Sequence, residues 1–382
     1  MSNKLAVYTI CKNESKYVGK WVECMKEADY MVVLDTGSED NTMELLEEYS
    51  KIYPNLIYKQ EKFIPWRFDI ARNANIDMIP EDANILLSID LDECIQTPGW
   101  ADLIRESWIE GLHTRGQYMY VWSHTNDGKP ARTFFYNKMH DRSWKWKAPV
   151  HEYLCRIVDG EPTATYALEN TLELGFNFLV EHFPDPTKSR GSYLDLLEIR
   201  VEEDPEDTIA PVYLAHEYYY RGKYSECIQL MDKIIEKNLP YSELEYADFH
   251  LFKGDSYYQL DDTSNAAKEY MDAIRIFPEF RDPYLKLADM YLSENRYNIA
   301  IGLVKEALAT SIRQYSWLEG DLSWSYMPYD ILSRCYYFIN DFEKSLTNAT
   351  IALSYDTQNE RLKNNLKIIK DKFLKNKKGQ DN

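Results

Sequence analysis

The sequence predicts an α/β domain built on a mixed sheet, followed by an all-α domain of repeated helix pairs. In the first part of the 382-residue chain, short apolar runs alternate with amphipathic stretches, and residues 117–180 are rich in aromatic, strand-forming segments. From about residue 190 the periodicity is helical, and one internal spacing recurs. We therefore expect two domains, at residues 1–190 and 191–382.

The first domain alternates predicted strands and helices. The apolar runs that predict buried strands are Leu5–Ile10, Tyr30–Leu34, Leu56–Tyr58 and Ile85–Ile89. The stretches that predict helices are Ser15–Glu27, Asp40–Tyr49 and Asp69–Met78. This order is typical of a parallel sheet, in which ligands bind at the carboxyl ends of the strands. Asp35 and Asp90 each follow such a strand, and the aromatic segments after residue 117 predict an antiparallel extension of the sheet.

The second domain repeats a pattern of small and aromatic residues. A small residue precedes a tyrosine by three positions at Ala215/Tyr218, Gly254/Tyr257, Ala288/Tyr291 and Ser333/Tyr336. Twelve positions after each small residue another follows, at Cys227, Ala266, Ala300 and Ser345. The spacing resembles the tetratricopeptide repeat, in which small residues let paired helices cross closely. We expect an insertion at Arg313–Tyr326 and a final capping helix with a basic tail.

Composition excludes some classes of function. The chain carries 44 basic and 63 acidic residues, a net charge of -19, which disfavours a nucleic-acid-binding protein. We find no apolar run long enough to span a bilayer and no signal peptide at the N-terminus, so we expect a cytoplasmic protein without a transmembrane segment. The six cysteines have no paired spacing, and this predicts reduced thiols rather than a zinc cluster or a disulfide framework.

Two acidic turns follow the predicted strands. Asp90 and Asp92 come after the run ILLSI, and carboxylates at the break of a strand can converge on Mg²⁺ or Mn²⁺ together with substrate phosphates. The alternative for this turn is a solvated acidic loop. Asp35 opens a strand–turn–helix connector in which Gly37 permits the tight turn, but the connector alone does not explain Asp35.

The segments LAVYTICKNE, VVLDTGSEDNT and WRFDIARNANIDMIPEDANILLSIDLDE together resemble family 2 glycosyltransferases of the GT-A fold, which has a Rossmann-like mixed sheet. The chain is most similar to the bacterial branch that continues into tetratricopeptide repeats, with lipopolysaccharide-core-type and glycocin peptide glycosyltransferases. The resemblance implies an inverting, metal-dependent hexosyltransferase-type enzyme. Its donor would be a nucleotide diphosphate sugar, most often UDP-linked. It also implies that Thr9 and Asp35 contact the nucleoside, that Arg72 lies near the donor, and that Asp90 and Asp92 form the DXD motif for Mn²⁺ or Mg²⁺.

The same resemblance assigns residues nearer the acceptor. In WKWKAPVHEY, Glu152 matches the place of the general base, although His151 stays an alternative base that Glu152 would orient. His182 is similar to a histidine that completes the metal site, because imidazole and carboxylate both suit Mn²⁺. Lys188 and Arg190 are expected at the donor diphosphate, with a solvated hinge as the alternative.

Other functions are weaker matches. A nucleotidyltransferase would need a glycine-rich phosphate loop, which ICKNESKYVG does not supply. A non-catalytic tetratricopeptide scaffold with a degenerate nucleotide-sugar-binding domain would be favoured by loss of the metal carboxylates, and both are present. We expect the acceptor to be a peptide, a glycan or a lipid-linked molecule. The repeats would present it or mediate formation of a homodimer.

Overall fold

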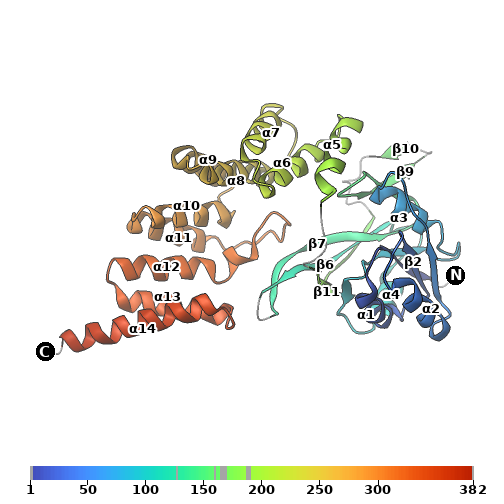
Figure 1. Ribbon diagram of the computed structural model, residues 1–382, viewed down its shortest axis with the longest axis horizontal. Helices are drawn as coiled ribbons and strands as arrows, with labels where there is room; N and C mark the ends of the chain where they lie inside the picture. Colours follow the sequence, from blue (N-terminus) through green and yellow to red (C-terminus); the bar gives the residue numbers. More distant parts are fainter. Residues whose placement is uncertain (1–2, 126–127, 159–160, 164–169, 186–190, 381–382) are drawn as a thin grey trace. The chain divides into compact units, whose positions relative to one another are not determined.

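The computed structural model describes residues 3–125, 128–158, 161–163, 170–185 and 191–380. They divide into two compact units, one made of Met1–Ser123 and Phe134–Asp204 and the other of His124–Thr133 and Pro205–Asn382 (Figure 1). The predicted domain boundary after residue 190 touches residues 186–190, which lie outside the described part of the chain. That boundary therefore stays a prediction.

An eight-stranded mixed sheet forms the centre of the first unit, in the order β3-β2-β1-β4-β7-β6-β11-β5. Its strands are β1 (Leu5–Cys11), β2 (Tyr30–Asp35), β3 (Leu56–Gln60), β4 (Ile85–Ser88), β5 (Glu93–Ile95), β6 (Arg115–His124), β7 (Pro130–His140) and β11 (Thr171–His182). Strand β1 pairs in parallel with β2 and β4, and β2 pairs in parallel with β3. Strand β7 is antiparallel to β4, and β5 is antiparallel to β11. The predicted α/β fold with a mixed sheet is confirmed.

Both faces of the central strands are covered. Leu5 and Val7 of β1 pack into a core with α1 (Ser15–Met25), α2 (Thr42–Ile52) and α4 (Trp100–Ser107). The alternate residues Ala6 and Tyr8 pack on the other face, against residues of α3 (Phe68–Ile76) and of a second sheet. That sheet consists of β8 (Trp144–Lys147), β9 (Tyr153–Val158) and β10 (Glu161–Thr163). Burial on both faces explains why the parallel strands are continuous apolar runs rather than alternating ones.

The second unit consists of successive helix pairs (Figure 1). After α5 (Tyr193–Glu203), which belongs to the first unit, the helices are α6 (Ala210–Tyr220), α7 (Tyr224–Glu236), α8 (Glu243–Gln259), α9 (Thr263–Ile276), α10 (Arg281–Ser293), α11 (Tyr297–Ala309), α12 (Met327–Phe338), α13 (Phe342–Tyr355) and α14 (Glu360–Gln380). The predicted helical repeats are confirmed, and α14 is the predicted final helix. The insertion between α11 and α12 contains only a short 3₁₀ helix, η1 (Asp321–Trp324).

The repeated small residues lie where paired helices cross. A side chain on Gly254 of α8 would meet the Tyr270 ring of α9 at 2.6 Å, so the aromatic side chain fills the space that glycine leaves open. In the α12–α13 pair, the Ser345 hydroxyl donates to the Ser333 carbonyl at 2.8 Å. Small side chains of this kind let helix backbones approach closely, which explains why the spacing recurs.

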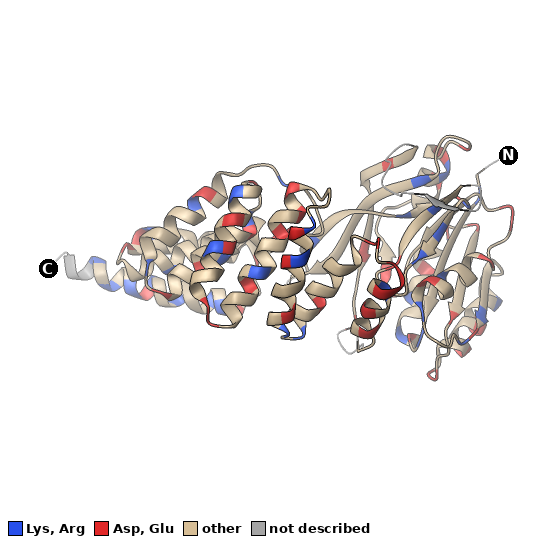
Figure 2. Ribbon diagram, turned by 90° about the horizontal axis from the view of Figure 1, so that it is seen from above, with Lys and Arg blue, Asp and Glu red and all other residues tan. Residues whose placement is uncertain are grey.

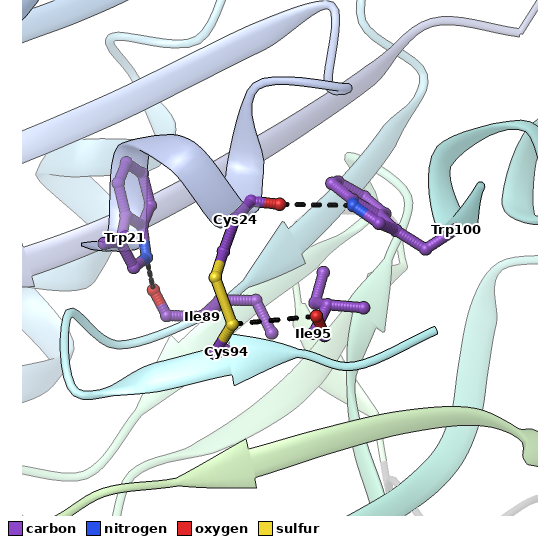
Figure 3. Close-up of a disulfide and its surroundings, with 6 residues drawn as sticks. All are labelled: Trp21, Cys24, Ile89, Cys94, Ile95 and Trp100. Atoms are coloured by element: carbon purple, nitrogen blue, oxygen red, sulfur yellow. Dashed lines mark hydrogen bonds between the residues drawn. A yellow bond between two sulfur atoms is a disulfide. The ribbon is translucent and has the colours of Figure 1, made fainter. Parts of the chain in front are cut away.

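The expectation of six reduced thiols is wrong for Cys24 and Cys94, which form a disulfide between α1 and β5 (Figure 3). The cysteines are 70 positions apart, so no local spacing indicates the pair, and only the packing of α1 against the sheet brings them together. On either side, the Trp21 indole donates to the Ile89 carbonyl at 3.0 Å and the Trp100 indole donates to the Cys24 carbonyl at 3.2 Å. The remaining cysteines are buried and take no part in a disulfide: Cys11, Cys155, Cys227 and Cys335.

A search of the described helices for a segment long and apolar enough to cross a membrane finds none.

We predict that replacing both Cys24 and Cys94 with serine lowers the free energy of unfolding of the first unit. The disulfide closes a long loop, and loss of such a crosslink typically costs about 2–5 kcal/mol. Urea unfolding followed by tryptophan fluorescence measures the change. As a control, a dithiol reductant should lower wild-type stability to that of the double variant and leave the variant unchanged. Equal stability of wild type and variant without reductant would contradict the prediction.

Candidate functional site

Acidic and basic residues are interspersed along the ribbons of both units, so the distribution of charged residues along the chain does not by itself mark a site (Figure 2). Buried charged side chains are more informative about a functional site. A buried ion needs partners, and buried ionisable groups are concentrated at catalytic sites. In the first unit, buried or half-buried charged side chains gather at the carboxyl end of β4 and on the strands beside it.

The acidic turn after β4 is built by reciprocal hydrogen bonds. The Asp90 backbone N–H donates to Glu93 Oε2 at 2.8 Å, and the Glu93 backbone N–H donates to the Asp90 carbonyl at 2.9 Å. Between them, Leu91 is buried in the core of the sheet, which sets the direction of the turn. This is an ordered turn, in contrast to the solvated loop that was the alternative for the two carboxylates.

Arg72 of α3 joins this turn to Glu152. Its side chain is only 6% exposed, and it donates to Asp90 through Nη1 at 2.9 Å and to Glu152 through Nε at 2.5 Å. The Nη1 group also donates to the Ser88 hydroxyl at 3.1 Å, and the guanidinium lies over the Trp146 ring. The planar fork of arginine can hold two carboxylates in fixed directions at once. Arg72 therefore fixes the position of Asp90, a predicted metal ligand, relative to Glu152, the predicted base.

Lys138 of β7 approaches Asp90 from another direction. Its side chain is 7% exposed, and its ammonium lies 3.1 Å from Asp90 Oδ2 and 3.2 Å from Glu93 Oε1. Glu93 also accepts a hydrogen bond from the Tyr120 hydroxyl at 2.7 Å. Burial favours a raised pKa for Asp90, but the positive charges of Arg72 and Lys138 outweigh it and hold that pKa well below its usual range. The pKa of Glu93 is raised, chiefly by burial.

Asp92 and His182 form a second pair at this turn. His182 Nε2 lies 3.3 Å from Asp92 Oδ2, and His182 Nδ1 lies 3.0 Å from the Trp122 carbonyl oxygen. Because a carbonyl oxygen can only accept a hydrogen bond, Nδ1 must carry a proton. In the neutral ring the lone pair of Nε2 therefore faces the Asp92 carboxylate. Burial favours a lower pKa for His182, but the protonated ring can donate from Nε2 to Asp92, and this hydrogen bond outweighs burial and raises the pKa. Two electron-pair donors that converge in this way fit one divalent cation, and an oxygen and nitrogen donor set suits Mn²⁺.

The structure separates the two candidates for the base. The Glu152 carboxylate joins the buried cluster through Arg72. The exposed His151, whose φ of 47° lies in the left-handed region, instead packs its ring edge-on against Tyr193, with centroids 5.7 Å apart. Arg200 of α5 donates to the carbonyls of Val150 and His151 and so holds this segment. Which of Glu152 and His151 acts as the base stays a prediction.

Thr9 and Asp35 lie on adjacent parallel strands, β1 and β2, and both are fully buried. Asp35 Oδ1 accepts hydrogen bonds from the Gly37 and Ser38 backbones at 2.9 and 2.8 Å, and from Gln60 at 2.9 Å. The carboxylate thus organises the turn at the end of β2, which is the structural explanation that the connector pattern lacked. Contact of Thr9 and Asp35 with a nucleoside stays a prediction.

The remaining predicted donor-site residues, Lys188 and Arg190, lie outside the described residues.

Lys138, Glu93 and Tyr120 are parts of the cluster that sequence reasoning missed. Glu93 directly follows Asp92, and Lys138 is a charged residue within a strand rich in aromatic residues, so the sequence contains a signal for each. The role of Lys138 can be recognised only when the order of strands in the sheet is known, because the pairing of β7 with β4 brings the lysine to Asp90.

A second group of potential metal ligands lies in the other unit, where His250, Glu269 and Asp272 bring ligand atoms close together. The Lys253 ammonium lies 3.1 Å from Glu269 Oε1, and His250 Nδ1 lies 2.6 Å from Glu269 Oε2. Because a lysine and a histidine already bind this buried carboxylate, the group is explained as an internal ion-pair network.

Comparisons with known proteins address the two units separately. Residues 6–162 match the family model described as Glycosyl transferase family 2. A search of curated proteins finds no match.

Among solved structures, the chain is similar to a thermophilic TPR protein of Thermus thermophilus, at 16% identity and a TM-score of 0.36 over 46% of this chain and 88% of that one. It is also similar to MamA of Desulfovibrio magneticus, at 13% identity and a TM-score of 0.34 over 44% and 92% of the two chains. The Arabidopsis OM64 TPR domain matches at 16% identity and a TM-score of 0.29 over 34% and 97%. Structural similarity at TM-scores this low supports no conclusion beyond the helix packing described above.

We predict that Arg72→Met lowers the free energy of unfolding of the first unit by about 3–5 kcal/mol, because it removes the cation that binds the mostly buried Glu152 and leaves Asp90 with Lys138 alone. Tryptophan fluorescence during urea unfolding reports mainly on this unit, which holds most of the tryptophans. Lys145→Met is the matched control, since Lys145 forms an exposed ion pair with Asp77 in the same unit and its loss should cost about 1 kcal/mol or less. A similar cost for the two variants would show that Arg72 does not hold the cluster.

Proposed function

Since the chain carries a family 2 glycosyltransferase domain at residues 6–162, we propose that the protein transfers a sugar from a nucleotide diphosphate sugar, with inversion and with help from a divalent metal ion. The observation that carries this proposal is the sharing of Arg72 between Asp90 and Glu152. The shared guanidinium joins a carboxylate of the DXD motif to the candidate base. Direct displacement needs both functions beside the same anomeric carbon.

The reaction is a single displacement. The acceptor oxygen forms a bond to the anomeric carbon while the bond from that carbon to the donor phosphate oxygen breaks. The nucleoside diphosphate leaves with the bonding electrons, and the acceptor proton passes to Glu152. A general base of this kind contributes about 10²–10⁴-fold to the rate.

Of the three predicted metal ligands, Asp92 and His182 are proposed to bind the ion, and Asp90 is proposed to orient the turn instead. A bound Mn²⁺ or Mg²⁺ supplies positive charge that stabilises the leaving diphosphate. Support comes from the converging lone pairs of Asp92 and His182, whose nearest side-chain atoms are 3.3 Å apart. Thr9 and Asp35 are proposed to contact the nucleoside, which we expect to be uridine, and Lys188 and Arg190 to contact the diphosphate.

The acceptor is proposed to be a peptide, a glycan or a lipid-linked molecule, with the helix pairs of the second unit presenting it or forming a homodimer. We place the reaction in the cytoplasm, as the sequence predicts, although thiols are kept reduced there and the structure contains the Cys24–Cys94 disulfide. Alkylation of the chain in intact cells therefore tests the location: free Cys24 and Cys94 support it, and a native disulfide indicates an oxidising compartment.

A donor panel tests the activity itself. The full chain is incubated with Mn²⁺ and individual nucleotide sugars, and hydrolytic release of the nucleoside diphosphate is measured. Release from one donor, lost on removal of the metal with a chelator, supports the proposal. Absence of both release and binding for every donor contradicts it.

We predict that Asp92→Asn weakens metal-dependent binding of the nucleotide sugar at least about 10-fold, because the amide keeps the shape of the carboxylate but removes its charge. Calorimetric titration with the donor, with and without Mn²⁺, measures the effect. Asp102→Asn is the control, since Asp102 is an exposed residue of α4, in ion-pair contact with Arg105. Undiminished Mn²⁺-dependent binding by Asp92→Asn would remove Asp92 from the metal site.

We predict that Glu152→Gln slows donor hydrolysis and transfer by about 10²–10⁴-fold while donor affinity stays within about 2-fold. The amide still accepts a hydrogen bond from Arg72 but no longer takes a proton. His151→Ala is the comparison, and we expect it to cost less. Normal turnover in Glu152→Gln together with an inactive His151→Ala would make the histidine the base.

A further inference from the structure

The cluster beneath the DXD turn carries its own neutralising cations. Three carboxylates, those of Asp90, Glu93 and Glu152, meet two cations, Arg72 and Lys138, within ion-pair distances of 2.5–3.2 Å. Both cations are almost completely buried, so water screens these interactions little. Little negative charge is therefore left over at this point of the sheet to attract a further cation.

Both oxygens of Asp90 already have cationic donors. Arg72 Nη1 binds Oδ1 at 2.9 Å, while Oδ2 accepts from Lys138 at 3.1 Å and from Arg72 Nη2 at 3.3 Å. A divalent ion placed at Asp90 would meet the repulsion of two nearby positive charges. Asp92 and His182 then supply a single negative charge and a neutral nitrogen, a weak set for a divalent ion by itself. Mg²⁺-like sites of this kind use one or two carboxylates plus the phosphates of the substrate.

We propose that Lys138 is a positioning residue that acts as an internal counter-ion, keeping the DXD turn ordered without metal and making divalent-cation binding depend on the donor diphosphate. This inference rests on the proposed function, because the diphosphate in question is that of the nucleotide-sugar donor. Lys138 orders the turn because one ammonium binds both Asp90 and Glu93, and Glu93 in turn holds the Asp90 backbone. The diphosphate brings the negative charge that the cluster lacks.

Lysine rather than arginine suits this role. The ammonium is a compact charge without a fixed fork, and it lies within cation–π range of Tyr136, 5.0 Å from the ring centre. Arg72 already provides the directional contacts on the other side of Asp90. When the Lys138 charge is removed, Arg72 still orients Asp90, and the net negative charge at the turn increases.

The test is calorimetric titration of the full chain with Mn²⁺, first alone and then with UDP. Wild type should bind Mn²⁺ at least about 10-fold more tightly in the presence of UDP. Lys138→Gln keeps hydrogen bonding to both carboxylates but loses the charge, and it should bind Mn²⁺ alone at least about 10-fold more tightly than wild type. A merely structural role would leave Mn²⁺ affinity unchanged or weaken it.

Two controls separate charge from folding. Lys138→Arg keeps the charge and should bind Mn²⁺ as wild type does. Lys145→Met removes a more exposed lysine, paired with Asp77 on the first unit, and should also behave as wild type. Circular dichroism establishes that each variant is folded, and Lys138→Met replaces Lys138→Gln if the latter does not fold.

The outcomes are distinct. Unchanged Mn²⁺ affinity in Lys138→Gln and Lys138→Met overturns the counter-ion role. Where calorimetry shows that wild type binds UDP, equal Mn²⁺ affinity with and without UDP overturns it as well. If the glycosyltransferase proposal alone is wrong, neither UDP nor any nucleotide sugar binds, while Lys138→Gln still gains affinity for Mn²⁺.

Discussion

The guanidinium of Arg72 is the contact on which the arrangement of the site depends. A buried arginine that binds two carboxylates cannot move toward one without losing the other, so α3, the turn after β4 and the segment before β9 are held in one geometry. The stacking of Arg72 on Trp146 adds a fourth element to the same point, because Trp146 lies on β8. One side chain thereby joins both sheets of the first unit.

Much of the fold could be predicted because its signals are local. Apolar runs such as the one in β1 show burial on both faces, and the alternation with helices gives the parallel order. The helix pairs were predictable for a different reason. A close crossing leaves no room for a side chain at Gly254, because the Tyr270 ring fills the space, and this constraint recurs at a fixed spacing. Of the candidate site, Asp90, Arg72 and Glu152 were identified by motif, and the structure brings these three together.

Contacts between distant segments could not be predicted in this way. Lys138 reaches Asp90 only because β7 follows β4 in the sheet, a pairing that no local pattern specifies. The Cys24–Cys94 disulfide was missed for the same reason, since the packing of a helix on a strand sets its partner. The adjacent residues His151 and Glu152 illustrate a further limit. A left-handed φ at His151 turns successive side chains toward different neighbours, and the sequence does not show which one joins the cluster.

The disulfide between α1 and β5 also changes the covalent topology of the chain. It closes a ring that contains β2, β3 and β4 together with both Asp90 and Asp92. A peptide bond cut anywhere inside this ring leaves two fragments that remain joined and can stay folded around the same sheet. Proteolytic nicking of the connection between β3 and α3 would thus be invisible on a non-reducing gel and would appear only after reduction.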